Sequence, residues 1–300
     1  MAEDVKEVTK RLNELNKRVE DLSTKVTTLQ TKVESNGRGR TTIISKNRPQ
    51  EVLSPDPFKL PEVIPPTPQE DVDGIVGGKE TSDFPDCCAV GNDQGYYCTG
   101  TLIAPNVVVT AGHCTDSTRV FLRGRNVNKP SEGETIRVDR EFEHPEADLR
   151  VLVLASDSEV EPRHVAQGDE VGNPENATLV GFGTVNLAGN VGYGIKRMVE
   201  VPIASLDCGT TAEQQEFGCT LGKEIVAGHR GLLKDSCRGD SGGPLYIRGE
   251  DGDFHLLGAT SRGLSNTQNV CGDGGIYVRV DQFLDWVREV TGVDTPGPLA

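Results

Sequence analysis

The sequence has little positive charge and no long apolar segment, and each deficit excludes a class of protein. Its 31 Lys and Arg residues face 46 Asp and Glu residues, which gives a net charge of -15 at pH 7. An acidic chain is a poor ligand for nucleic acid or for an anionic membrane surface, so we expect neither as a partner. No run of 18 or more apolar residues occurs, and no membrane-spanning helix is predicted.

A secretory signal is also missing from the first residues as they stand. The segment Met1–Glu7 is charged and has no apolar region of the kind that signal peptides carry. The eight cysteines indicate the opposite, because disulfides persist mainly in oxidising compartments. From these conflicting signals we predict a cytoplasmic protein and keep secretion as the alternative.

Residues 1–36 are predicted to form a coiled coil. Between Val5 and Val33, apolar residues recur at steps that alternate between three and four, which is the heptad pattern. Branched residues at one core position with Leu at the other favour a parallel dimer, without excluding a trimer. Of the two positions that flank the core, one is mostly basic and the other is neutral. A heterologous partner with acidic residues therefore fits better than a homodimer. The alternative is an amphipathic helix that lies on its own domain.

Residues 37–74 differ in composition and are predicted to be a linker. Seven prolines fall between Pro49 and Pro68, and aromatic residues are few. Such a segment cannot bury a core of its own. Phe58 and Leu60 are the apolar side chains through which it could dock on the domain that follows.

From Ile75 onward, short apolar runs alternate with Gly, Asn, Asp and Pro, which is typical of a β-sandwich or β-barrel. Only the end of the chain has helical spacing, and it predicts a helix over 280–291. The predicted strands include 101–103, 107–110, 151–154, 177–181 and 256–259.

A glycine-rich loop at 235–245, with the sequence DSCRGDSGGPL, has Ser241 at its centre. Glycines allow backbone N–H groups to converge on one point, which suits an oxyanion site beside a nucleophilic hydroxyl. A serine nucleophile needs a base, and His113 follows an apolar run in the motif TAGHC. The base needs an orienting carboxylate, and Asp148 opens the apolar run DLRVLVL. Taken alone, the loop could equally be a surface turn.

Four motifs together resemble the landmarks of the trypsin-like serine proteases, which have the chymotrypsin fold. They are IVGG at 75–78, TAGHC at 110–114, DLRVL at 148–152 and the loop at 235–245, in the family's order. The resemblance implies an all-β protease domain over 75–300, with two antiparallel six-stranded β-barrels and a C-terminal helix. It implies that Ser241 attacks the scissile carbonyl, that Asp148 orients His113 as the base, and that the N–H groups of Gly239 and Ser241 form the oxyanion hole. No cofactor is implied.

The same resemblance places Asp235 at the base of the S1 pocket, where a carboxylate selects Arg or Lys of a protein substrate. Gly263, in the run Ser261-Arg262-Gly263, and Gly275 correspond to the pocket walls, where glycine leaves room for a long side chain. Arg262 replaces the aromatic residue that is usual beside Ser261. We expect a preference for acidic residues upstream of the cleaved bond; the alternative is that Arg262 points to solvent.

The resemblance further implies that the chain is a zymogen. Cleavage between Gly74 and Ile75 would create an amino group that pairs with Asp240 and completes the oxyanion site. An enzyme that prefers Arg or Lys cannot easily cut after Gly74, so we expect a separate activating protease. Cleavage after Asp73 would leave one residue too many for this pairing. Because the propeptide 1–74 has no cysteine, nothing covalent would retain it, and we predict that its coiled coil recruits the zymogen to a partner or a cut site.

Six cysteines are assigned to disulfides through the resemblance. Val226 stands where the usual partner of one of them would be, which favours a local bridge for that cysteine. Cys87 and Cys88 are left over, either as a vicinal bridge or reduced. Arg125 stands about where some relatives have a calcium-binding carboxylate, so we predict no metal. The expected pairs are Cys98 with Cys114, Cys208 with Cys219, and Cys237 with Cys271.

Two other functions compete with this interpretation. The protease-like domain could be a catalytically silent interaction module recruited through its coiled coil, but the complete set of His113, Asp148, Ser241 and Gly239 argues against that. An esterase or lipase also uses a serine nucleophile. It predicts the chain order Ser, Asp, His, whereas the order here is His, Asp, Ser.

Overall fold

The structure is a computed structural model that describes residues 75–293. The predicted coiled coil at 1–36, the linker at 37–74 and the last seven residues lie outside the described residues, so those predictions stay predictions. None of the described helices is long and apolar enough to cross a membrane. The strands of the described part are β1 (Lys79–Glu80), β2 (Cys87–Asn92), β3 (Gly95–Ala104), β4 (Val107–Thr110), β5 (Arg119–Leu122), β6 (Glu134–Glu143), β7 (Arg150–Leu154), β8 (Asn176–Gly181), β9 (Arg197–Ser205), β10 (Glu224–Ala227), β11 (Pro244–Arg248), β12 (Phe254–Gly263) and β13 (Gly275–Arg279).

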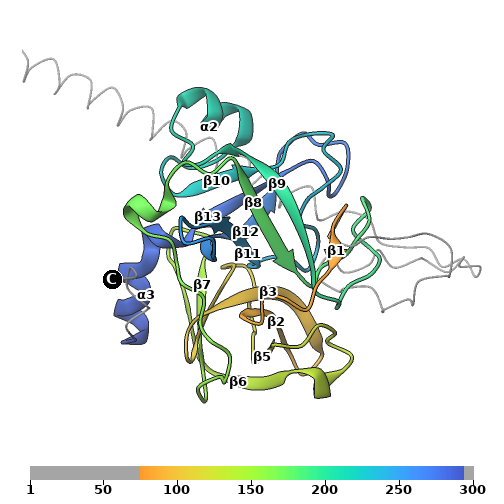
Figure 1. Ribbon diagram of the computed structural model, residues 1–300, viewed down its shortest axis with the longest axis vertical. Coiled ribbons are helices and arrows are strands. Elements are labelled where there is room, and N and C mark those ends of the chain that lie inside the picture. The colour runs from red at the N-terminus through yellow and green to blue at the C-terminus, as the bar shows by residue number, and fades with distance from the viewer. Residues whose placement is uncertain (1–74, 294–300) are drawn as a thin grey trace, which may run out of the picture. The chain divides into compact units, whose positions relative to one another are not determined.

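The first half of the domain is a closed antiparallel barrel in the order β2-β3-β4-β7-β6-β5, drawn in orange to lime in Figure 1. Its strands are rich in β-branched residues, which suit a pleated and half-buried surface. Alternate side chains fill the barrel, among them the fully buried Val90, Leu102, Val108 and Leu152. Closing the sheet removes its edges, so this half needs no further strand to satisfy its backbone.

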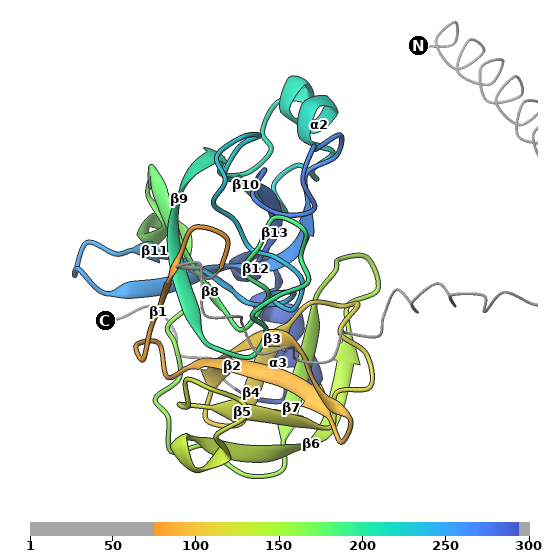
Figure 2. The same ribbon diagram turned by 90° about the vertical axis from the view of Figure 1, so that its right-hand side faces the viewer.

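The second half repeats the architecture with β8-β9-β10-β13-β12-β11, closed by the pairing of β11 with β8. The short β1 adds to the outer edge of β9, as both views show (Figures 1 and 2). Leu179, Val199, Ile225, Leu245 and Tyr277 fill this barrel. The predicted pair of six-stranded antiparallel barrels is confirmed.

Short helices complete the described part. α2 (Thr211–Phe217) begins with a capping box, in which Thr210 and Glu213 satisfy each other's backbone N–H groups. The predicted C-terminal helix is present, but its first turn is the 3-10 helix η3 (Val280–Phe283) and only Leu284–Thr291 is α-helical, as α3. Two further single turns are η1 (Pro130–Glu132) and η2 (Gly168–Val171).

Three disulfides join the cysteine pairs that the resemblance implies. Cys87 and Cys88 remain as buried thiols, since successive side chains of β2 point to opposite faces. Cys87 packs among residues of both barrels, whereas Cys88 packs inside the first barrel. A bridge between these neighbours is therefore not formed.

Candidate active site

The pairing of β4 with β7 brings His113 and Asp148 together. Thr110 at the end of β4 lies opposite Arg150 at the start of β7, so the loops that carry the two residues leave the barrel side by side. The backbone N–H of His113 and its ring Nδ1 each lie 3.0 Å from Asp148 Oδ1, and Nδ1 is also 3.0 Å from Oδ2. Residues 35 positions apart thus form one hydrogen-bonded unit.

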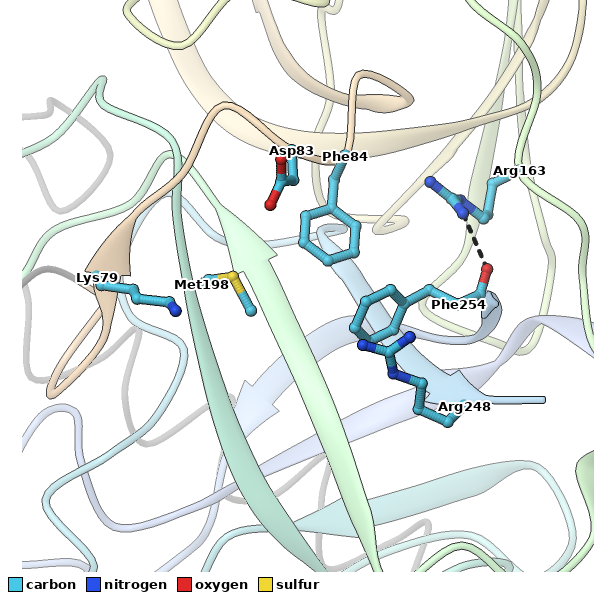
Figure 3. Close-up of a pocket in the computed structure, with 7 residues that line it drawn as sticks. All are labelled: Lys79, Asp83, Phe84, Arg163, Met198, Arg248 and Phe254. Carbon is cyan, nitrogen blue, oxygen red and sulfur yellow. Dashed lines mark hydrogen bonds between the residues drawn. The ribbon is translucent and has the colours of Figure 1, made fainter. Parts of the chain in front are cut away.

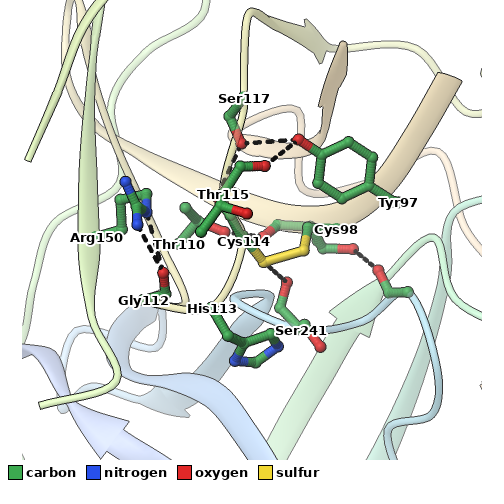
Figure 4. The surroundings of a disulfide bond; sticks show 12 residues. Tyr97, Cys98, Thr110, Gly112, His113, Cys114, Thr115, Ser117, Arg150 and Ser241 are labelled. Carbon is green, nitrogen blue, oxygen red and sulfur yellow. Dashed lines mark hydrogen bonds between the residues drawn. A yellow bond between two sulfur atoms is a disulfide. The ribbon is translucent and has the colours of Figure 1, made fainter. Parts of the chain in front are cut away.

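Close backbone packing fixes this unit. A Cβ at position 112 would lie 3.0 Å from Asp148 Oδ1, so any larger residue would press on the carboxylate and displace it slightly. Arg150 clamps the same turn from the other side by donating from Nε and Nη2 to the Gly112 carbonyl, over 3.1 and 2.9 Å (Figure 4). Glu141 and Glu143 on β6 balance the charge of that guanidinium.

The protonation state of the pair follows from its contacts. Burial by itself raises the pKa of Asp148, but hydrogen bonds from His113 and Ser261 outweigh it and hold that pKa below its usual value. An ionised carboxylate only accepts hydrogen bonds, so Nδ1 of His113 carries the proton that faces it. Nε2 is then left as the basic atom of the ring, in a side chain that is 46% exposed.

Ser241 is positioned by the first barrel although it belongs to the second. Its carbonyl accepts a hydrogen bond from Thr99 N over 2.9 Å, and it lies 3.7 Å from Cys114 Sγ in the Cys98–Cys114 bridge. In the view of Figure 4, the Ser241 side chain and the His113 ring both lie below that disulfide. The hydrogen bond from Thr99, the residue after Cys98, therefore places the Ser241 loop against the bridge that holds the loop of His113.

The turn before Ser241 depends on Gly239 and on a hydrogen bond from Thr99. Gly239 has a φ of 95°, and a side chain there would meet the Tyr193 ring at 2.4 Å, so no other residue fits. Thr99 Oγ1 holds the turn by donating to the Gly239 carbonyl over 2.8 Å. Within residues 75–293, nothing accepts a hydrogen bond from the N–H of Gly239 or of Ser241. Both donors are thus available to a developing negative charge.

Asp235 is a buried carboxylate at the start of the same loop. It is 4% exposed, and burial raises its pKa to about 7 despite hydrogen bonds from the backbone and from Ser236. Tyr277 and Ser236 also approach its Oδ1, at 3.4 and 3.3 Å. Among the described residues no cation pairs with it.

The two glycines predicted as pocket walls face each other across adjacent strands. Gly263 on β12 pairs with Gly275 on β13. A Cβ at Gly263 would point into open space, and one at Gly275 would come within 3.4 Å of Arg262 and Tyr277. The structure therefore places both glycines on the β12–β13 pair, with free volume beside Gly263.

A second buried carboxylate, Asp240, has only backbone partners. It accepts hydrogen bonds from Gly183 N over 2.7 Å and Cys237 N over 2.9 Å. Burial and, to a smaller extent, the nearby Asp235 nevertheless raise its pKa to about 7, although the backbone hydrogen bonds and the charge of Arg197 act in the opposite direction. No Lys or Arg of the described part lies within ion-pair distance of Asp240. This loop therefore contains two buried acids that lack counterions.

Ile75, the first described residue, already lies against the second barrel. It is 1% exposed and packs into the core of that barrel. Its φ of 40° is a strained value for a β-branched residue. The next residue, Val76, forms an antiparallel bridge with Asp235. The chain at the predicted cleavage site is thus connected directly to the loop that carries Asp235 and Asp240.

Sequence reasoning missed the partner of Arg262. The Arg262 side chain is 42% exposed, but its Nη1 and Nη2 donate to the two carboxylate oxygens of Glu224, over 2.7 and 2.9 Å. Glu224 is the first residue of β10 and is almost buried. No local motif marks it, because the pairing depends on how β10, β13 and β12 line up. Arg125 is likewise engaged, 3.5 Å from Glu80.

A separate pocket of about 350 Å³ contains none of the predicted site residues. Figure 3 shows Arg163 there, donating to the Phe254 carbonyl; its charge is already matched by the buried Asp86. Arg248 lies over the Phe254 ring at 3.8 Å. The lining residues are Lys79, Asp83, Phe84, Arg163, Met198, Arg248 and Phe254.

Comparisons with known proteins agree with this geometry. The family model described as Trypsin matches residues 75–287. A trypsin of Saccharopolyspora erythraea is 31% identical over 231 residues, which cover 72% of this chain and 97% of that protein. Trypsin 5G1 of Aedes aegypti is 30% identical over 218 residues, covering 68% of this chain and 78% of that one. The solved structure of neuropsin, a serine protease expressed in the limbic system of mouse brain, has the same fold. It superposes with a TM-score of 0.60 at 24% identity, covering 71% of this chain and 98% of that chain.

These findings correct the predicted location. Proteases with this type of domain are typically secreted, and the described residues contain three disulfides. Such bridges persist in oxidising compartments, so the prediction of a cytoplasmic protein is wrong and an extracellular location agrees with the structure. The error came from giving the charged first residues more weight than the cysteines.

Proposed function

Because the chain belongs to the trypsin family and is a serine endopeptidase, we propose that it cleaves protein substrates after Arg or Lys, with Ser241, His113 and Asp148 as its triad. The observation that carries the proposed specificity is Asp235, a buried carboxylate with no counterion among residues 75–293 and a pKa raised to about 7. A guanidinium or ammonium group from the substrate would supply that counterion. The open space beside Gly263 supports the passage of a long side chain.

The proposed mechanism follows from the hydrogen bonds of the site. His113 Nε2 takes the proton of the Ser241 hydroxyl as that oxygen attacks the scissile carbonyl, and later gives it to the leaving amine. Asp148 holds Nδ1 and stabilises the imidazolium that forms. The free N–H groups of Gly239 and Ser241 bind the oxyanion of the tetrahedral intermediate.

We further propose that the full chain is a zymogen cut between Gly74 and Ile75. The support is Asp240, whose buried carboxylate has backbone donors but no cation in the described part of the chain. A new amino group on Ile75 would neutralise it and thereby fix the turn that carries Gly239. Since Gly74 does not suit an enzyme specific for Arg or Lys, a separate protease is proposed as the activator.

The coiled coil is proposed to act before activation, by recruiting the zymogen to a partner. The test compares activation of the full chain with that of a chain lacking residues 1–36, using the physiological activator. A slower cut in the shortened chain is expected, because recruitment raises the local concentration of the cut site. Equal rates would remove this role.

The proposed activity is tested by producing the domain with Ile75 as its first residue and digesting an unfolded protein mixture. Mass spectrometry of the products should show new C-termini at Arg and Lys, and a Ser241→Ala control should give none. Cleavage after other residues would contradict the specificity. A domain that neither digests protein nor reacts with a fluorophosphonate would instead support the silent interaction module.

A further inference from the structure

A chain of hydrogen bonds connects Arg262 to the triad. Arg262 Nη1 donates to Ser261 Oγ over 3.2 Å, and Ser261 Oγ donates to Asp148 Oδ2 over 2.7 Å. Asp148 in turn accepts from His113 Nδ1. The guanidinium of Arg262 is therefore only two hydrogen bonds away from the carboxylate that orients the base.

A bulge in the β12–β13 pairing determines the directions in which the Ser261 and Arg262 side chains point. The register shifts between Thr260 and Arg262, so Ser261 has no regular partner on β13. Ser261 consequently turns its hydroxyl toward the first barrel, while Arg262 turns toward the start of β10. Ser261 and Arg262 are neighbours on β12 but bond to different elements of the domain.

Arg262 is held firmly at its far end. Besides the two bonds to Glu224, its Nη2 donates to the Gly218 carbonyl over 3.0 Å. With the bond to Ser261, four of the five guanidinium donors are in use. Glu224, whose side chain is 9% exposed, is itself fixed by Thr220 N over 2.7 Å. Little of the Arg262 charge is left for an acidic substrate residue.

We propose that Arg262, anchored by Glu224, is a positioning residue of the triad that acts through Ser261; this inference rests on the proposed function. Because Ser261 Oγ accepts a hydrogen bond from Arg262, its own proton is directed at Asp148. The positive charge also opposes a second positive charge on His113, and Glu224 offsets part of that effect. The pair therefore sets both the orientation of Asp148 and the pH range in which His113 is basic.

Other charges face the triad and stay unchanged in the test. Arg150 on β7 contacts the turn before His113, and Glu141 and Glu143 on β6 neutralise it. Asp235 and Asp240 belong to the nucleophile loop. The variants below alter only Arg262 and Glu224, so differences among them report on this pair.

The test uses the domain that begins at Ile75 and a chromogenic amide of a blocked single arginine, which is too short to contact residues beyond the S1 pocket. Arg262→Met should lower kcat about three- to tenfold with little change in KM, because Ser261 loses its donor. It should also move the acid limb of the pH profile of kcat up by about half a pH unit. We use kcat because it reports the enzyme–substrate complex, in which the substrate cation is proposed to pair with Asp235. Glu224→Gln keeps an acceptor for Arg262 and should move that limb down.

The double variant Arg262→Met/Glu224→Gln removes both charges. Its acid limb should return close to that of the unchanged domain, while kcat stays as low as in Arg262→Met. Arg262→Lys keeps the charge and should preserve the acid limb, which also covers the case in which Arg262→Met folds poorly. Lys129→Met and Glu132→Gln, in the exposed pair on η1, are matched controls and should change neither value.

The proposal is overturned if the two single variants shift the acid limb in the same direction or not at all, or if only KM for longer peptides changes. Failure of the proposed function gives a different result, namely no hydrolysis by the unchanged domain. In that case the His113 ring is titrated by NMR in the same variants. Arg262→Met and Glu224→Gln should then shift the titration of the ring in opposite directions. The absence of these opposite shifts would equally refute the role of Arg262.

Discussion

The two barrels contribute unequal halves to the active site. On the first barrel, His113 and Asp148 satisfy each other's hydrogen bonds, and Arg150 is balanced by two glutamates. On the second barrel, Asp235 and Asp240 are buried without counterions in the described part of the chain, and burial raises the pKa of each to about 7. The charges of the first half are paired as folded, whereas the two acids of the second half have no cation in the described part of the chain. We assign one of these acids to the substrate and the other to the activating cut.

The largest expected effect concerns the cation from the substrate. Asp235→Ser should lower kcat/KM for arginine amides roughly 10³- to 10⁵-fold, because the substrate cation then enters a buried site without a counterion. Steady-state kinetics on matched arginine and leucine amides measures the change. Fluorophosphonate labelling of Ser241 should persist, since the triad is untouched. The exposed Asp157→Ser is the control, and an Asp235→Ser domain that still prefers arginine would contradict the assignment.

A smaller effect is expected at Asp240, which we propose pairs with the amino group that the cut creates on Ile75. In the domain that begins at Ile75, Asp240→Asn should lower kcat about 10²- to 10³-fold, comparable to the loss of one oxyanion donor. Binding of a small guanidinium inhibitor to Asp235 should change far less. Inhibitor titration and active-site titration on one preparation distinguish a loss of catalysis from a loss of inhibitor binding. Full activity of Asp240→Asn would show that the turn at Gly239 forms without the ion pair.

The pH dependence of inhibitor binding tests the protonation state of Asp235. A guanidinium binds the ionised form of Asp235, whose pKa in the free protein is about 7. As the pH falls below that value, protonation of Asp235 competes, and inhibitor affinity should fall about tenfold per pH unit. Above pH 7 the affinity should level off. Calorimetric titrations between pH 5 and 8.5 test this, and a flat profile down to pH 5 would mean that Asp235 is ionised throughout.

The smallest effect is expected on the first barrel. Because the contacts between His113 and Asp148 lie within that barrel, cleavage before Ile75 should hardly move the NMR titration of the His113 ring. The cut and uncut chains should agree within about 0.2 pH units, the scale of a weak and distant charge. A shift of a full pH unit would show that the cut alters the surroundings of His113 before substrate binds.

Much of the fold and of the candidate triad could be predicted from the sequence. The motifs around His113, Asp148 and Ser241 are short and local, and their order identified both the fold and the candidate triad. The strand over 107–110 was predicted at its observed bounds, because β-branched residues fill it. Strand alternation alone would have excluded a bridge between Cys87 and Cys88.

The rest depends on contacts that no local pattern encodes. Glu224 and Arg262 are 38 residues apart and meet only because β13 lies between their strands. The expected preference for acidic substrates treated Arg262 as an unpaired cation, and its pairing with Glu224 weakens that expectation. The burial of Asp240 among backbone donors likewise becomes visible only once the second barrel is closed.

We propose that the second barrel becomes competent only when a cut supplies the amino group of Ile75. The most direct measurement is the rate at which a fluorophosphonate labels Ser241 in one preparation, before and after cleavage between Gly74 and Ile75. We predict an increase of at least about 10²-fold, the scale of a missing oxyanion donor. Equal labelling rates before and after the cut would show that the second barrel is competent without the new amino group.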